Sequence, residues 1–156
     1  MDKLSQIYAH IELLCKQKDF NRAAHYFREL ENSGVELPPA LLVIKADVIQ
    51  LSDKSQYRLS HSEESLLRAI ELEPHNLEAH IELGYFYYAS MDQAEKAVPY
   101  FQQAEKYAEK SLVAAILGKA KALIDLGLFN EAAEFLKHSY FATHPEIIKF
   151  LSETKP

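Results

Sequence analysis

Glycine and proline are scarce in this sequence. The chain has 4 glycines and 6 prolines in 156 residues, whereas a fold of many short strands needs frequent turns built from these residues. The chain also lacks a run of roughly 18 apolar residues that could cross a membrane, and its N-terminus lacks the apolar core of a secretory signal. These shortages favour a helical fold, and we expect a cytoplasmic protein with no membrane partner.

Cysteine is nearly absent. Cys15 is the single cysteine, so no disulfide can form within the chain, and a lone thiol suits a reducing compartment. It falls on a predicted helix beside Leu13 and Leu14, away from a helix N-terminus that would lower its pKa. We therefore interpret Cys15 as a packing residue rather than a nucleophile.

Positive charge is in deficit. The formal net charge is -6 at pH 7, which disfavours non-specific binding to nucleic acid and would attract a basic partner. Hydrophobic residues make up 48% of the chain and charged residues 26%, as in an ordinary folded domain. The length suits one domain with a sizeable core.

The common motifs of catalysis and cofactor binding are missing as well. The sequence has no G-x-S-x-G motif and neither of the glycine-rich loops that cradle phosphates. Its 7 histidines include His75 and His80 near one helix start, but the zinc motif H-E-x-x-H does not occur. We expect no enzyme activity, no cofactor and no metal, and we interpret the histidines as surface or interface residues.

What the sequence does contain is an internal repeat. Bulky apolar residues recur at intervals of 35 to 39 residues, at Phe27, Leu66, Phe101 and Leu136. A small residue lies three positions after each of the last three, at Ala69, Ala104 and Ser139. Such a period, close to ~34 residues, is typical of helical repeat proteins.

The local sequence resembles the tetratricopeptide repeat family. Residues 68–76 (RAIELEPHN) resemble its closing helix and proline stop, and residues 79–87 (AHIELGYFY) resemble its opening helix with a Leu-Gly pair. Residues 18–24 and 126–133 resemble its turn between helices. The resemblance implies an all-α, right-handed α-solenoid of about four helix pairs, with repeats at about 4–37, 39–76, 77–110 and 113–143 and a capping helix at 144–153, in a single domain over 1–156.

The repeats depart from the family pattern in places. The second has a long segment at 52–62 instead of a tight turn, which is either functional or a tolerated insertion. The third has one extra residue near Ser90 and Met91. In the fourth, Gly118 and Ala120 compete for the small position, so its register stays open.

Helix boundaries follow from apolar spacing and end signals. These signals predict helices at about 3–17, 20–33, 39–51, 61–73, 77–90, 93–109, 112–126, 130–140 and 144–153. Pro39 suits the first turn of the third helix. Thr143 and Glu146 form a capping-box pair before the last helix, with Pro145 in its first turn.

In stacked repeats of this kind, the first helix of each pair lines the inner face. From helical phase and the resemblance, we expect the inner groove to be lined by Tyr8, Glu12, Val43, Ile44, Asp47, Glu78, Ile81, Glu82, Tyr85, Tyr88, Leu117 and Lys121. Phe86 and Tyr87 fit positions that pack between helices. Tyr85 and Tyr88 share another face, where they either point into the groove or are partly covered by a neighbouring helix.

The charges of these residues restrict the partner. The family's carboxylate clamp, which holds the acidic C-terminus of heat-shock chaperones, needs Lys, Asn and Arg on the inner face. The corresponding positions here hold Tyr8, Glu12, Ile44, Glu78 and Glu82, whose carboxylates would repel an acidic tail. We expect the partner to be a protein or peptide that presents a basic or apolar segment.

These features predict a protein-interaction module, a scaffold, adaptor or chaperone-like protein that binds a peptide or helix in its concave groove. The chain is similar in size, acidity and repeat number to the tetratricopeptide chaperones of bacterial secretion systems. The alternatives are an immunity or inhibitor protein that masks a basic partner and an enzyme or metal-binding domain. Homodimerisation through the uncovered N-terminal end is left open.

Overall fold

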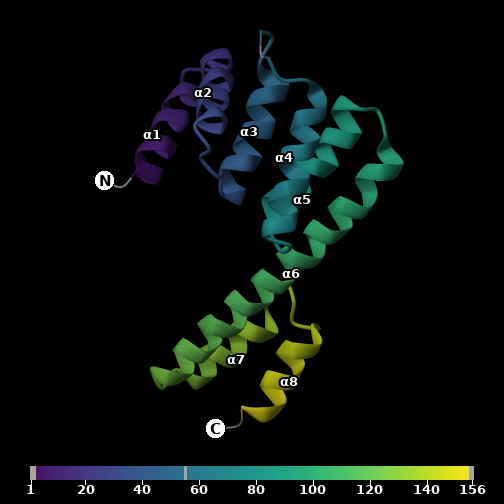
Figure 1. Ribbon diagram of the computed structural model, residues 1–156. Helices are drawn as coiled ribbons and strands as arrows, with labels where there is room; N and C mark the ends of the chain where they lie inside the picture. Colours follow the sequence, from purple (N-terminus) through teal and green to yellow (C-terminus); the bar gives the residue numbers. More distant parts are fainter. Residues whose placement is uncertain (1–2, 55, 155–156) are drawn as a thin grey trace. The chain divides into compact units, whose positions relative to one another are not determined.

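The protein is helical throughout the residues that the computed structural model describes, 3–54 and 56–154. That part of the chain contains eight α-helices, one π-helical turn and no strand (Figure 1), which confirms the expected all-α class. The elements are α1 (Lys3–Lys16), α2 (Phe20–Asn32), α3 (Pro39–Leu51), α4 (Leu59–Leu72), α5 (Leu77–Tyr85), η1 (Phe86–Ser90), α6 (Ala94–Asp125), α7 (Phe129–Lys137) and α8 (Pro145–Glu153). Among the described residues, no helix combines the length and apolar character needed to cross a membrane.

The chain divides into two compact units, Met1–Ala104 and Glu105–Pro156. The first unit contains α1 to α5, η1 and the beginning of α6. Within it, each helix from α1 to α5 packs against the next, and α3 also packs against α5. The second unit contains the rest of α6 together with α7 and α8. The expectation of a single domain over 1–156 stays a prediction.

Several helix ends follow directly from the local sequence. Pro38 precedes α3 and Pro39 occupies its first turn, where a missing backbone N–H costs nothing because it has no partner within the helix. The Asn76 side chain accepts a hydrogen bond from the Ala79 backbone N–H at 2.9 Å and so caps α5. Gly127, at φ 77°, allows the left-handed turn that ends α6.

The extra residue expected near Ser90 is absorbed by η1. The Met91 backbone N–H donates to the Phe86 carbonyl oxygen, five residues earlier, at 3.1 Å. A π-helical turn of this kind accommodates one inserted residue without ending the helix. The helix expected at 77–90 is therefore an α-helix that continues as a π-helical turn.

Two details of the predicted helix map are wrong. The break expected between 109 and 112 is absent, because α6 runs unbroken from Ala94 to Asp125; no glycine or proline lies near this point to stop it. The cap of α8 is His144 rather than Thr143. The His144 Nδ1 accepts from the Glu146 backbone N–H at 3.3 Å, and this contact leaves Thr143 outside the helix cap.

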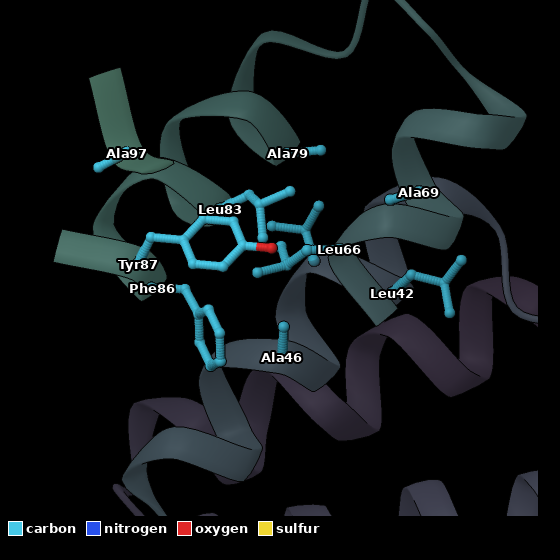
Figure 2. Close-up of a cluster of buried hydrophobic side chains, with 10 residues drawn as sticks. Leu42, Ala46, Leu66, Ala69, Ala79, Leu83, Phe86, Tyr87 and Ala97 are labelled. Atoms are coloured by element: carbon cyan, nitrogen blue, oxygen red, sulfur yellow. The ribbon is translucent and has the colours of Figure 1, made fainter. Parts of the chain in front are cut away.

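The first unit is built on two clusters of buried side chains. One cluster joins α1, α2 and α3 around Ile11, Phe27 and Leu41. The other joins α3, α4, α5, η1 and the start of α6 (Figure 2), where Phe86 and Tyr87 are both buried, as expected. The buried residues of this second cluster are Leu42, Val43, Ala46, Leu66, Ala69, Ala79, Leu83, Phe86, Tyr87 and Ala97.

Gly84 allows α5 and α6 to approach closely in this cluster. A Cβ atom at this position would lie 2.7 Å from Cε1 of the Phe101 ring, closer than carbon atoms can approach. The lack of a side chain at Gly84 thus lets the aromatic ring of α6 pack directly on the backbone of α5.

The described part of the segment between α3 and α4 is fastened to α2. The Asn21 side chain accepts from the Ser52 hydroxyl at 2.6 Å and the Lys54 backbone N–H at 3.0 Å, and donates to Asp53 at 2.7 Å. Farther along, the Tyr57 hydroxyl donates to the Glu31 carboxylate. These bonds give the long connection a structural role in holding α2 against α3.

Candidate binding surface

An open pocket lies between α1 and α3 in the first unit. Its volume is about 360 Å³, and four of the predicted groove residues line it: Tyr8 and Glu12 from α1, and Ile44 and Asp47 from α3. Within each helix these residues are three or four positions apart, so both pairs present one helical face to the pocket. The remaining lining residues are Ile11, Cys15, Phe20, Val48 and Leu51.

The floor of this pocket is apolar. Ile11 and Val48 belong to the buried cluster beneath it, and Ile44 packs against that cluster. Leu51, in contrast, is 58% exposed at the rim. An apolar side chain entering the pocket would therefore meet mostly hydrocarbon and remove the exposed leucine from water.

Carboxylates gather at the edge of the pocket that faces α5. Burial, the nearby Glu82 and Glu78, and a hydrogen bond to Glu82 together raise the pKa of Asp47 to about 7, and burial contributes most. Burial and Glu78 also raise the pKa of Glu82, while the hydrogen bond from Asp47 opposes that rise. Near neutral pH, Asp47 and Glu82 thus share a proton between α3 and α5.

Within residues 3–54 and 56–154, no cationic side chain pairs with this cluster. The ion pairs of the described residues do not include Asp47, Glu78 or Glu82. Glu12, on the α1 side, pairs with Lys16 of its own helix at 2.7 Å, and both side chains are exposed. The α3–α5 edge of the pocket is therefore a site of uncompensated negative charge.

Two exposed tyrosines, Tyr85 and Tyr88, lie on α5 and η1 beyond these carboxylates. Glu78, Glu82 and Tyr85 lie four and three residues apart, so they follow one face of α5. Tyr85 is 54% exposed, and its ring packs edge-on against Phe101 with the ring centroids 5.0 Å apart. Tyr88 is 59% exposed, while Ile81 is half-buried. The Tyr85 ring is thus held in place with more than half of its surface in solvent.

Three of the predicted groove residues lie elsewhere. Val43 is 1% exposed and belongs to the buried cluster shared by α3, α4 and α5. Its placement on the groove surface is therefore wrong, because a fully buried side chain offers no surface to a partner. Leu117 and Lys121 belong to the second unit, where Leu117 packs against the core. The Lys121 ammonium lies 5.9 Å from the centre of the Phe150 ring.

The sequence reasoning also missed five pocket residues: Ile11 and Val48 of the floor, and Cys15, Phe20 and Leu51. Leu51 follows Ile44 by seven positions and Cys15 follows Tyr8 by seven, a spacing that repeats the helical face and could have revealed both. Phe20 begins α2, and no periodicity of α1 or α3 points to it. Burial and the charge of Asp47 raise the pKa of Cys15, which favours the protonated, less nucleophilic thiol at neutral pH.

The pocket thus presents apolar side chains, the Tyr8 ring and the carboxylates of Glu12 and Asp47. Comparisons with protein-family models, with curated proteins and with solved structures find no match. In the part of the chain that the structure describes, no three His, Cys, Asp or Glu side chains are placed to hold a metal ion. The function is therefore inferred from the side chains that line the pocket.

Proposed function

We propose that this chain is a protein-interaction module that binds a segment of a partner protein along α1, α3 and α5. The observation that carries the proposal is the convergence of Tyr8, Glu12, Ile44 and Asp47 on one open apolar pocket, with Glu82 of α5 in contact with Asp47. Exposed aromatic and apolar side chains beside fixed charges are what protein-binding surfaces use for affinity and specificity.

The arrangement of the first unit supports a tetratricopeptide-like solenoid as the architecture behind this surface. The helices α1, α3 and α5 occupy the position of first helices in three successive pairs, and α3 packs directly on α5. In such solenoids the first helices of neighbouring pairs line one continuous inner face. We further propose a reducing, cytoplasmic location, because the chain has a single thiol.

The test is affinity capture from the native host, followed by mass spectrometry. The full chain should retain a set of proteins that the variant Leu51→Glu fails to retain, because a carboxylate at the rim would disrupt the apolar contact. The double variant Tyr85→Ala/Tyr88→Ala should weaken the same capture. Circular dichroism should show unchanged helicity in both.

The matched control is Leu67→Glu, which changes a 42% exposed leucine on α4, outside the pocket. This variant should retain the same proteins as the unmodified chain. Equal capture by the Leu51→Glu and Leu67→Glu variants would refute a binding role for the pocket.

A further inference from the structure

The pocket between α1 and α3 combines an apolar floor with a one-sided charge. The floor is formed by Ile11, Ile44 and Val48, and the exposed Leu51 stands at the rim. Beside it, Asp47 contacts Glu82. A pocket of several hundred cubic ångströms is large enough for a substantial apolar side chain. The carboxylates determine which residues can lie next to that side chain in the partner segment.

We propose that the partner segment inserts a large apolar side chain into this pocket and places an adjacent lysine or arginine between Asp47 and Glu82. This inference rests on the proposed binding function and specifies the chemistry of its ligand. A cationic side chain of the partner would complement the charge of this edge. Three carboxylates of α3 and α5 lie close to one another there, and no ion pair of the described residues includes them.

The entering cation would displace the proton that Asp47 and Glu82 share. While the pocket is empty, that proton relieves the repulsion between the two carboxylates. A lysine or arginine would do so more completely, and the Asp47 proton would leave to solvent. Binding should therefore release a proton and become tighter as the pH rises through 7, because a higher pH removes the proton that the cation must displace.

The other titratable groups that face Asp47 come from α1 and α5. On α1 they are Tyr8, Glu12 and Cys15; burial raises the pKa of both Tyr8 and Cys15, and the bond to Lys16 lowers that of Glu12. On α5 they are Glu78 and Glu82. Among the groups whose pKa is displaced, Asp47 is the one brought to about 7.

The experiment selects a display library of random peptides on the full-length chain. Enriched peptides should carry a large apolar residue with a lysine or arginine at a fixed spacing, and acidic peptides should be depleted. A synthetic peptide from the enriched set is then titrated at about pH 6 and about pH 8 by isothermal calorimetry. Binding should be several-fold tighter at the higher pH and should weaken as salt increases.

Two matched variants test the role of the carboxylates. The double variant Asp47→Asn/Glu82→Gln should bind the peptide about tenfold more weakly at the higher pH and lose the pH dependence. The double variant Glu29→Gln/Glu64→Gln removes two exposed carboxylates of α2 and α4 and should bind as the unmodified chain does. Its unchanged binding would show that net charge alone is not responsible.

The possible failures are distinguishable. Enriched peptides without basic residues, or equal binding by the Asp47→Asn/Glu82→Gln variant, would overturn this inference and leave the binding function standing. A selection that enriches no peptide, or enriches only peptides that the Leu51→Glu variant binds equally well, would overturn the binding function itself.

Discussion

Asp47 is a carboxyl group for which burial and charge conflict. Its carboxyl lies at the edge of an apolar pocket, next to Glu82 and Glu78. Ionisation there is unfavourable, so the group stays protonated in the folded protein up to about pH 7. In an unfolded chain the same group ionises near its ordinary pKa of 3.8. The folded state therefore binds this proton more tightly than the unfolded state does.

This difference predicts how stability depends on pH. Because the pKa of Asp47 is higher in the folded state, its contribution to the free energy of unfolding falls as the pH rises from about 4 to about 7. The variant Asp47→Asn should be more stable than the unmodified chain by about 1–2 kcal/mol near pH 8, after allowance for partial contact with solvent. Urea denaturation near pH 5 and pH 8 measures the effect.

The gain should shrink toward the lower pH, where Asp47 is protonated in the folded protein. A gain that is equal at both pH values, or a loss at the higher one, would contradict the shared proton between Asp47 and Glu82.

Gly84 provides a second test at the level of one residue. Alanine is a better helix former than glycine by about 1 kcal/mol, yet the new Cβ would collide with the Phe101 ring. We expect the collision to dominate, so Gly84→Ala should lower the free energy of unfolding by about 1–3 kcal/mol. Thermal unfolding followed by circular dichroism measures the change.

The chain supplies its own control in Gly118, which lies in α6 with open space around the position of its missing Cβ. The variant Gly118→Ala should therefore gain about 0.5–1 kcal/mol from helix propensity alone. If both alanine variants stabilise the protein, the Phe101 ring does not pack closely on the backbone of α5 at Gly84.

At the scale of elements, the continuity of α6 is the main departure from the repeat pattern. A repeat period of 35 residues calls for a turn near Lys110 and Ser111, but the local sequence contains helix formers and neither glycine nor proline. Proline is tolerated in a turn, but it breaks the interior of a helix. The variant Ser111→Pro should therefore cost about 3 kcal/mol and reduce helicity by circular dichroism.

Ser111→Ala is the matched control, because alanine favours a continuous helix and serine less so. This variant should be neutral or slightly stabilising. If the proline variant proves as stable as the alanine variant, a turn is present at this position.

The helices that sequence reasoning located best are those with explicit end signals. The range 39–51 was predicted for α3 and matches it, because Pro38 and Pro39 fix its start. For α6 the turn was inferred from the repeat period rather than from the residues themselves, and the period does not determine the local structure. Short-range signals therefore predicted boundaries better than the repeat did.

The same distinction applies to the pocket. Helical phase within α1 and α3 was enough to bring Tyr8, Glu12, Ile44 and Asp47 to one face. Phase could not show that Asp47 contacts Glu82, because that contact depends on how α3 packs on α5, 35 residues farther along the chain. Val43 was misplaced for a related reason: it lies next to Ile44 in sequence, but it is buried in the cluster that joins α3 to α4 and α5.

At the scale of the whole molecule, the two units differ in the size of their cores. The first unit has two clusters of large buried side chains. The described core of the second consists of Val113, Ala120, Leu136 and Ile147 with partly buried neighbours. Because local stability follows the amount of buried apolar surface, the second unit should open at a lower free energy than the first.

Hydrogen exchange followed by mass spectrometry tests this difference. Amides of α3 and α4 should exchange slowest, and amides of α7 and α8 should exchange markedly faster under native conditions. Exchange at one common rate in all four helices would mean that the chain unfolds as a single cooperative unit.

Cys15 lines the pocket beside Asp47 and is the only thiol in the chain. A fluorescent maleimide would consequently tag the proposed groove and no other point of the molecule. Because burial raises the pKa of this thiol, labelling should be slow at neutral pH and should accelerate in alkaline buffer. A bound segment should slow it further, so the rate of labelling would report occupancy of the pocket before the partner has been identified.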